Sequence, residues 1–204
     1  FLGLDGNYLP DHRVVNIVPR KSGFTIQTGL ETIACARVVL AGGVANARLG
    51  PMVGMDIPVK PLRGQILVTE RLDPIFEIPT SLIRQTDEGT VMLGDTREDV
   101  GYDEGTTLQG LNKIAANGIR TFPFLARVRL VRAWAALRPM PKDTFSIYAC
   151  STEYPNAFAV NCHSGVTLAA VHSTHLADWI AGGRDITPGV EPFSLDRFDV
   201  QAVA

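Results

Sequence analysis

Two segments in the C-terminal half of the chain decide its fold: AWAALRP at residues 133–139 and NCHSGVTL at residues 161–168. The first segment places Arg138 in an apolar run, directly before a proline. An unpaired buried guanidinium is costly, so Arg138 needs an anionic partner. That partner is either an acid of its own domain or the carboxylate of a ligand. The second segment is a loop of small residues that opens a helix.

The N-terminal residues predict strands of an α/β domain. Alternating polar and apolar residues predict a hairpin over residues 13–28. A nearly continuous apolar run at 36–41 ends in Gly42-Gly43, which is typical of a strand buried on both faces of a sheet. Ligand sites of α/β sheets form at the carboxyl ends of such strands. A short helix at 45–49, ended by Gly50-Pro51, follows this strand.

From residue 57 the pattern changes to that of a separate antiparallel sheet, which then returns to the first domain. An amphipathic helix is expected in the second sheet's domain, from about residue 107 to 121, because large apolar residues recur at helical spacing. These residues are Leu108, Leu111, Ile114, Ala115, Ile119 and Phe122. Strands are expected at 59–69, 81–85, 90–95 and 130–137, and after them at 145–149 and 157–161, before a helix at about 167–181 that Gly182-Gly183 ends.

These elements predict a fold of α/β plus α+β class. Residues 1–52 and 145–190 form a two-layer or three-layer α/β domain. Residues 57–142 form an inserted domain built on an antiparallel sheet, and residues 191–204 form a terminal segment.

Composition excludes several classes of function. The chain has 204 residues, of which 46% are hydrophobic and 20% charged, as expected for a folded protein. A net charge of −2 without a basic cluster argues against nucleic-acid binding. No apolar run is long enough to span a membrane. The three cysteines lack close pairing, which favours buried free thiols and a reducing, cytoplasmic setting.

A metal site is a weaker interpretation of four residues near the C-terminal helix. His172, His175 and Asp178 occupy positions i, i+3 and i+6 of one helix, and His163 lies in the loop before it. No cysteine or carboxylate spacing completes a zinc pattern, so we expect packing and surface roles and no metal.

The order of these segments resembles the D-amino-acid oxidase family of FAD-dependent oxidoreductases, which includes glycine and sarcosine oxidases and the D-hydroxyproline and opine dehydrogenases. The resemblance rests on Leu137-Arg138-Pro139, the turn Lys142-Asp143 and the loop at 162–168. It is supported by the strand ending in Gly42-Gly43 and by Arg63-Gly64-Gln65, which begins the substrate-domain sheet in the family. We favour a structural role for Arg63. The similarity runs over essentially the whole chain.

The resemblance implies FAD as cofactor and an amino acid or secondary amine as substrate, oxidised to its imine by hydride transfer to the flavin. Arg138 would hold the substrate carboxylate, because a planar guanidinium binds a carboxylate through two bonds. Ile83, Arg84 and Gln85 would line the substrate pocket. Many family members have glycine where this chain has Cys162, and often near Thr167. The residues expected to contact the flavin are Gly42, Gly43, His163, Ser164, Gly165, Val166 and Thr167.

The chain reads as the C-terminal portion of a larger protein. It begins with Phe1, and no G-x-G-x-x-G motif follows an N-terminal strand to hold the FAD pyrophosphate. We expect that motif upstream or on a partner chain, and we expect these residues alone to lose FAD in gel filtration. Two alternatives stay open: a non-catalytic or proteolytic fragment that cannot bind FAD, and half of a nicotinamide-dependent dehydrogenase. The particular substrate, the electron acceptor and the oligomeric state are not specified by the sequence.

Overall fold

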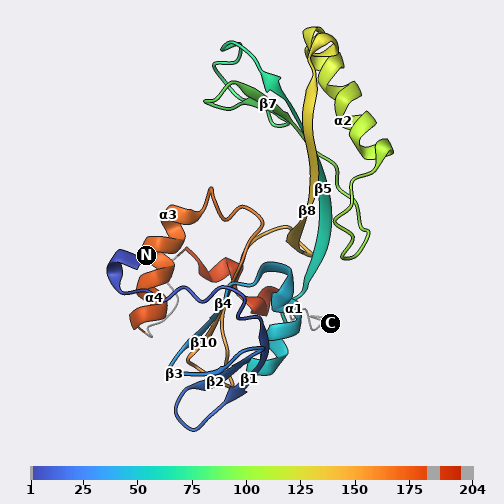
Figure 1. Ribbon diagram of the computed structural model, residues 1–204. Coiled ribbons are helices and arrows are strands. Elements are labelled where there is room, and N and C mark those ends of the chain that lie inside the picture. Colours follow the sequence, from blue (N-terminus) through green and yellow to red (C-terminus); the bar gives the residue numbers. More distant parts are fainter. Residues whose placement is uncertain (1, 183–188, 199–204) are drawn as a thin grey trace. The chain divides into compact units, whose positions relative to one another are not determined.

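The computed structural model describes residues 2–182 and 189–198 and divides into two compact units (Figure 1). Unit 1 comprises Phe1–Val59 and Pro141–Ala204, and unit 2 comprises Lys60–Met140. The sequence-based division into residues 1–52 with 145–190, 57–142 and a terminal segment 191–204 stays a prediction. The fold is mixed α/β, with strands in three separate sheets.

Unit 1 begins with a short 3-10 turn, Leu2–Leu4, and an antiparallel sheet. Strands β1 (Val14–Pro19) and β2 (Phe24–Thr28) form the predicted hairpin, which is therefore confirmed. Strand β3 (Thr32–Cys35), which the sequence pattern did not predict, adds to β2. Gly23 in the turn has φ of +86°, a conformation that favours glycine.

The second sheet of unit 1 has the order β4-β10-β9. Strand β10 (Ala157–Asn161) runs parallel to β4 (Val38–Leu40) and antiparallel to β9 (Ile147–Cys150). The prediction that the strand β4 is buried on both faces was wrong, because Val39 on it is 41% exposed. Strand β4 lies at the sheet's edge, and β10, in the centre, is the strand whose two faces are both covered.

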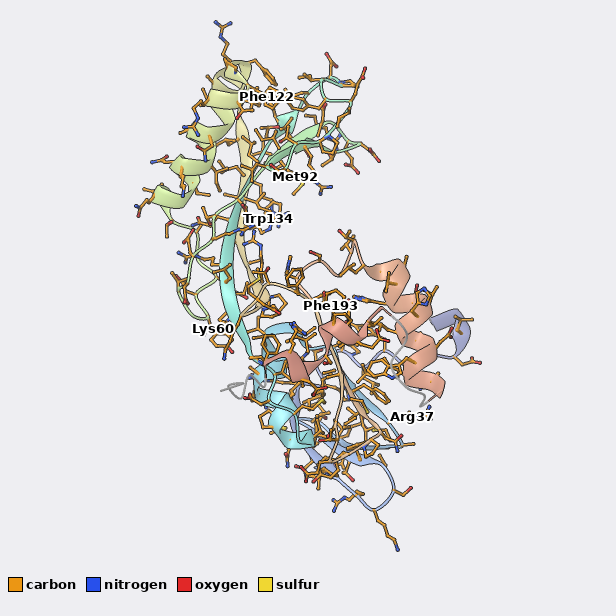
Figure 2. The ribbon with its side chains drawn as sticks, turned by 180° about the vertical axis from the view of Figure 1, so that it is seen from behind. Arg37, Lys60, Met92, Phe122, Trp134 and Phe193 are labelled. Atoms are coloured by element: carbon orange, nitrogen blue, oxygen red, sulfur yellow. The ribbon has the colours of Figure 1, made fainter. Side chains whose placement is uncertain are left out.

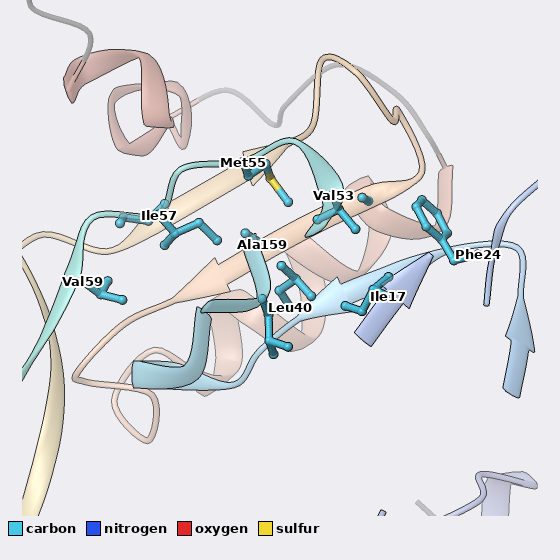
Figure 3. Close-up of a cluster of buried hydrophobic side chains, with 12 residues drawn as sticks. Ile17, Phe24, Leu40, Val53, Met55, Ile57, Val59 and Ala159 are labelled. Atoms are coloured by element: carbon cyan, nitrogen blue, oxygen red, sulfur yellow. The ribbon is translucent and has the colours of Figure 1, made fainter. Parts of the chain in front are cut away.

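The core of unit 1 lies on both sides of β10. Ala157 and Ala159 face a cluster that includes Ile17 and Val53 (Figure 3), whereas Phe158 faces a second cluster that includes Trp179. This alternation follows from the two-residue period of a strand. The rings of Phe158 and Trp179 meet edge to face, with centroids 5.2 Å apart.

Two helical regions of unit 1 differ from expectation. Helix α1 (Asn46–Leu49), with the 3-10 turn Gly43–Ala45 before it, does not end at Gly50-Pro51. It continues as the 3-10 turn Gly50–Val53, since proline needs no N–H partner in a first turn, and ends at Gly54 with φ of +71°. The C-terminal helix begins two residues later than predicted, and Gly183, named in its expected end, lies outside the described residues. That helix consists of α3 (Ala169–Val171), a π turn (His172–Leu176) and α4 (Ala177–Gly182), and short 3-10 turns follow at Glu191–Phe193 and Leu195–Phe198.

Unit 2 contains the third sheet, and helix α2 (Leu108–Thr121) lies along one side of it (Figure 1). The prediction that this sheet is antiparallel is confirmed, because β7 (Thr90–Leu93) pairs antiparallel with β5 (Val59–Arg71) and with β6 (Ile83–Gln85). Helix α2 (Leu108–Thr121) begins after Thr107, whose hydroxyl accepts a hydrogen bond from the Gly110 N–H at 3.2 Å. It ends before the 3-10 turn Pro123–Arg127. The strands, in sheet order, are β6 (Ile83–Gln85), β7 (Thr90–Leu93), β5 (Val59–Arg71) and β8 (Leu130–Pro141).

The predicted apolar face of α2 is confirmed in part, because Ile114 is buried and Leu111, Ala115 and Phe122 pack against the core of unit 2. Leu108 is 80% exposed, and the buried positions are Gly110, Ile114 and Gly118. A Cβ on Gly110 would overlap the side chain of Gln65 on β5, so the helix approaches the sheet through its glycines. A pattern that counts only large apolar residues misses this contact.

Candidate functional site

A buried asparagine joins the ends of two parallel strands in unit 1. The Asn46 side chain is fully buried, and its Nδ2 donates to the Leu40 carbonyl at 3.1 Å and to Asn161 Oδ1 at 3.2 Å. Its Oδ1 accepts from the Gly42 N–H at 2.9 Å. These bonds fix the carboxyl ends of β4 and β10 beside each other. Sequence analysis did not identify Asn46. The available signal was a polar side chain one turn beyond a strand that ends in Gly-Gly.

The loops that leave β4 and β10 at this edge carry the predicted cofactor residues. Gly42 is exposed, and Gly43 has φ of +58°. After β10, His163 Nε2 donates to the Thr144 carbonyl at 3.1 Å, which leaves Nδ1 to accept from the Ser164 hydroxyl at 3.0 Å. The next residues of the loop project little into the fold: Gly165 and Thr167 are exposed, and Val166 is 94% exposed. The structure therefore brings all the predicted flavin residues to one sheet edge.

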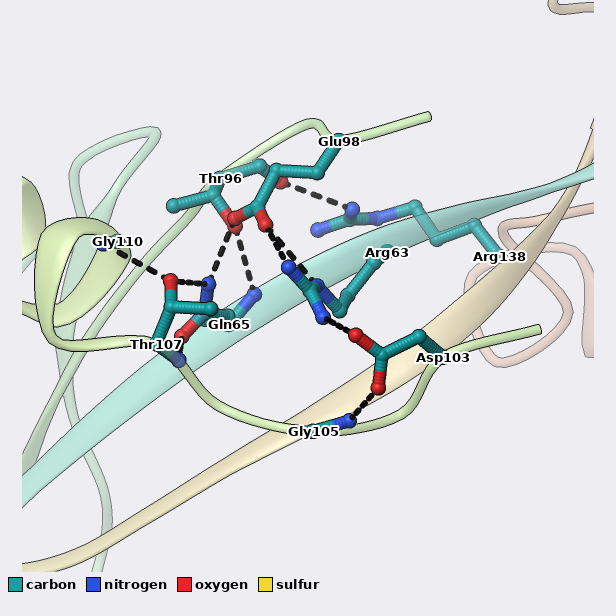
Figure 4. Close-up of polar contacts among 9 residues, drawn as sticks. All are labelled: Arg63, Gln65, Thr96, Glu98, Asp103, Gly105, Thr107, Gly110 and Arg138. Carbon is teal, nitrogen blue, oxygen red and sulfur yellow. Dashed lines mark hydrogen bonds and ion pairs between the residues drawn. The ribbon is translucent and has the colours of Figure 1, made fainter. Parts of the chain in front are cut away.

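Arg138 in unit 2 lies across the neighbouring strand β5 (Figure 4). Its Nη2 donates to Asp95 Oδ2 at 2.5 Å, and its Nη1 donates to the Thr96 carbonyl at 3.2 Å. The guanidinium rests on Gly64, where a Cβ would overlap it. The side chain is 26% exposed. Arg138 thus has a partner in its own unit, and the described bonds use two of its five N–H groups.

Arg63 is part of a buried polar network that holds the segment after β7 against β5 (Figure 4). Its Nε donates to Glu98 Oε2 at 2.9 Å, and its Nη1 donates to Asp103 Oδ2 at 2.5 Å. Gln65 Nε2 donates to Glu98 Oε1 at 2.7 Å, and Gln65 Oε1 accepts from the Thr107 N–H at 2.8 Å. The expected structural role of Arg63 is confirmed.

This network makes unit 2 sensitive to acid. The Thr96 hydroxyl and the Arg63 guanidinium lower the pKa of Glu98 from its ordinary value of 4.5 to about 2. A depressed folded-state pKa stabilises the fold above the unfolded value, and that contribution is lost as pH falls from about 4.5 toward 2.

Unit 2 should lose resistance to urea as the pH falls from about 6 to about 3. We expect this loss to be smaller in Glu98→Gln, because glutamine has no carboxylate to protonate. Glu104→Gln, at an exposed position in the same unit, is the matched control and should leave that loss unchanged. If the Glu98 variant loses as much urea resistance on acidification as the original protein, Glu98 is not a source of the acid sensitivity.

The three residues predicted to line a substrate pocket have different surroundings. Ile83 is buried in the core of unit 2. The Gln85 amide anchors a loop: Oε1 accepts from the Ile75 N–H at 2.8 Å, and Nε2 donates to the Asp73 carbonyl at 2.9 Å. Arg84 alone presents an exposed side chain. Packing and loop anchoring therefore account for Ile83 and Gln85, which leaves Arg84 as the predicted residue with groups available to a ligand.

The remaining reactive side chains provide neither a metal cluster nor a thiolate. No group of three or more His, Cys, Asp or Glu suited to a metal occurs in the described part of the chain. His172 Nε2 instead forms a hydrogen bond with the Tyr148 hydroxyl at 2.9 Å, and burial lowers its pKa. Cys35, Cys150 and Cys162 are free, and burial raises the pKa of each thiol. None of the described helices is long and apolar enough to cross a membrane.

A family model described as FAD dependent oxidoreductase matches residues 3–179. The chain belongs to this family. The resemblance inferred from the sequence is thereby confirmed, and FAD is the family's cofactor.

Named relatives agree with this assignment. A subunit of the opine oxidase of Agrobacterium tumefaciens (strain Ach5) is 39% identical, over 95% of this chain and 52% of the relative. Hydrogen cyanide synthase subunit HcnC of Pseudomonas protegens is 33% identical, over 80% of this chain and 41% of the relative. The crystal structure of glycine oxidase from Geobacillus kaustophilus has the same fold, with a TM-score of 0.81 and 22% identity over 90% of this chain and 51% of that one. The chain thus spans about half the length of the curated relatives it matches first.

The carboxyl edge of β4 and β10 fits a flat cofactor such as FAD. Gly43 takes a conformation that is costly for other residues, and a Cβ on Gly42 would lie 3.1 Å from Asn46 Oδ1. Both positions therefore favour glycine, which leaves backbone open to a planar ring. Cys162 and Thr167 differ from the family's glycines, but Thr167 is exposed and Cys162 is half-buried, so neither blocks this edge from within.

Proposed function

We propose that the protein containing this chain uses FAD to oxidise an amino acid or a secondary amine carboxylate to its imine. The observation that carries the proposal is the placement of Arg138, a partly buried guanidinium on the edge strand β8 with N–H groups beyond those bound to Asp95 and Thr96. The family match favours this cofactor over the nicotinamide alternative.

In this proposal the loops of unit 1 hold the flavin. Gly42 and Gly43 let backbone approach the ring, and the loop from His163 to Thr167 places the start of the C-terminal helix near it. Partial positive charge at a helix N-terminus stabilises negative charge nearby. When bound, FAD accepts the hydride of the substrate's α-carbon. The bond to the Thr144 carbonyl keeps His163 in one tautomer and orients its ring.

Arg138 would bind the substrate carboxylate and thereby orient the α-carbon. Asp95 holds the guanidinium in place, and the carboxylate of the substrate would use N–H groups that Asp95 does not. A substrate that arrives as the neutral amine needs no side-chain base. Exclusion of water around the ion pair would strengthen it.

The names of relatives support further parts of the proposal. Two of them are called subunits, which supports a partner chain for this protein as well. Opine oxidase supports an N-substituted amino acid as substrate. Free thiols in place of disulfides support a cytoplasmic location.

The test is anaerobic mixing of the purified flavoprotein with candidate substrates. We expect amine carboxylates to bleach the flavin absorbance and to yield an oxo acid after hydrolysis of the imine. The matched amine without a carboxylate is the control and should react far more slowly. The proposal fails if no amine carboxylate bleaches a fully loaded flavin.

Gly64→Ala should displace Arg138, because the added Cβ overlaps the guanidinium. We expect KM for an amine carboxylate to rise at least tenfold, since small displacements of positioning groups are costly. Gly29→Ala, where an added Cβ has no neighbour within 4 Å, is the control. An unchanged KM would show that the position of Arg138 on β5 has no bearing on substrate binding.

A further inference from the structure

A turn in unit 1 has a backbone conformation that its sequence disfavours. This turn, at residues 141–144, follows β8, and its Thr144 N–H donates to the Pro141 carbonyl at 3.1 Å. Thr144 takes φ of +69°. That left-handed region favours glycine and is costly for a β-branched residue. A residue in such a conformation needs support from its surroundings, and such residues are common at functional sites.

The Thr144 carbonyl is the group that holds His163. It accepts a hydrogen bond from His163 Nε2 at 3.1 Å, and His163 Nδ1 accepts from the Ser164 hydroxyl at 3.0 Å. Both ring nitrogens therefore have partners, which fixes the tautomer and the plane of the ring. His163 belongs to the loop at 162–168, the expected flavin loop. The direction of one carbonyl in the Thr144 turn thus determines the orientation of a residue in that loop.

Arg197 holds the residues on either side of Thr144. Its Nε donates to Asp143 Oδ2 at 2.6 Å, and its Nη2 donates to Asp143 Oδ1 and to the Phe145 carbonyl, each at 3.2 Å. Asp143 Oδ1 also accepts from the Phe145 N–H at 3.1 Å. One guanidinium is therefore tied to the residue before Thr144 and to the residue after it, which restrains the Thr144 carbonyl.

The Arg197 guanidinium is fully used by these and two further bonds. Its Nη1 donates to the Phe193 carbonyl at 2.6 Å and to the Ser194 carbonyl at 2.8 Å. Together with the three bonds around Thr144, five bonds match the five N–H groups of an arginine. The side chain is only 17% exposed. Its contacts are therefore those of a group that holds protein segments, and a ligand would have to displace one of them.

The segment that carries Arg197 is anchored in unit 1 by an aromatic ring. Figure 2 labels this residue, Phe193, whose ring meets the ring of Tyr148 on β9 edge to face, with centroids 6.0 Å apart. The Phe145 ring lies 6.2 Å from it, measured in the same way. Because Tyr148 is buried, the anchor is part of the core of unit 1. Arg197 therefore holds the Thr144 turn from a fixed position.

We propose that Arg197 is a positioning residue of the cofactor site: through Asp143 and Thr144 it fixes His163, and with it the loop that faces the flavin. This inference rests on the proposed function, because it assumes that the loop at 162–168 contacts FAD. The segment that contains Arg197 then belongs to the cofactor site, although Arg197 itself acts only through the turn.

The test is the dissociation constant of FAD, measured by flavin fluorescence after FAD is removed from the intact flavoprotein and titrated back. Arg197→Gln should raise this constant about fivefold, the effect of losing one hydrogen bond. His163→Gln should raise it by a similar factor. Because both changes break the same series of contacts, the double variant should bind FAD no more weakly than either single variant. The absorption maximum of the bound flavin should shift alike in all three.

Thr144→Gly provides a rescue that a general stabilising role of Arg197 would not show. Glycine adopts φ of +69° without steric cost, so the turn needs less support. In the Arg197→Gln background, Thr144→Gly should return the dissociation constant of FAD to within about twofold of the original.

Arg48→Gln is the matched control. Arg48 is an exposed arginine of the same unit that donates to the Val14 and Val15 carbonyls at 2.9 and 3.2 Å. Its removal should leave FAD binding unchanged. If Arg197→Gln does not fold, Arg197→Lys takes its place, because lysine keeps an ion pair with Asp143 but lacks the planar fork that also reaches the Phe145 carbonyl. The same non-additivity and the same rescue are expected.

The outcomes separate this proposal from the proposed function. Additive effects of Arg197→Gln and His163→Gln, an equal effect of Arg48→Gln, or a failed rescue by Thr144→Gly would each overturn the positioning role. If amine carboxylates bleach the flavin but Arg197→Gln leaves FAD binding unchanged, the positioning role is refuted and the oxidase function stands. If no amine carboxylate bleaches the flavin but the effects are non-additive and the rescue succeeds, the positioning role stands and the function is refuted.

Discussion

Arg138→Ala is expected to lower kcat/KM for an amine carboxylate by an amount equivalent to about 3–5 kcal/mol, by analogy with breaking a shielded charge pair. Arg138→Lys should lose less, because lysine keeps the charge but cannot form two parallel bonds to a carboxylate. The measurement is steady-state kinetics of the flavoprotein with an amine carboxylate and with the matched amine that lacks the carboxylate.

The amine without a carboxylate distinguishes binding from structure. Its oxidation should be nearly unaffected by Arg138→Ala, since that substrate never used the contact. Asp95 complicates the comparison, because removal of Arg138 leaves this half-buried carboxylate without its partner. The double variant Arg138→Ala, Asp95→Asn removes both charges and should show the same substrate-dependent loss. Equal losses for both substrates, or loss of the folded protein, would assign Arg138 to structure alone.

Asn46→Ala should lower the free energy of unfolding of unit 1 by about 2–4 kcal/mol, because it removes the hydrogen bonds of a fully buried side chain. These bonds join Asn46 to the Leu40 carbonyl, the Gly42 N–H and Asn161 Oδ1. The same change should reduce the amount of FAD that copurifies, since the loop at Gly42 and Gly43 loses its tie to β10.

Asn16→Ala is the matched control for this variant. Asn16 lies on β1 and donates to Gln27 Oε1 at 3.1 Å in an exposed position, so its removal should change stability by less than about 0.5 kcal/mol. Urea unfolding followed by circular dichroism, with flavin content from absorbance, measures both variants. A stable Asn46→Ala protein with full flavin content would show that this edge does not depend on the asparagine.

Local patterns predicted most of the strands because alternation and apolar runs are properties of neighbouring residues. The hairpin of β1 and β2 is an example, and so is the extent of α2. Ile114 was predicted on the buried face of α2, but Gly110 and Gly118 were not, because a glycine becomes an interface residue only when a sheet approaches it. Tertiary contact, and not helix propensity, decides that face.

The candidate site was predictable to the extent that it follows a general rule. Loops after parallel strands gather at one edge, so Gly43 and His163 could be placed together once β4 and β10 were recognised. The partner of Arg138 could not be predicted, because Asp95 comes from a loop of another strand. Gln85 looked like a pocket residue, but its amide hydrogen bonds within a loop depend on contacts that the sequence pattern does not record.

The parallel pairing of β4 with β10 determines the order in which the chain can fold. The whole of unit 2 lies between these strands in the sequence, so the central strand of unit 1 emerges from the ribosome only after unit 2 is complete. Closing so long a loop carries an entropic cost that is repaid only when β10 is buried. During synthesis, β4 must therefore wait with an unpaired edge while unit 2, which is continuous in the chain, acquires its structure first.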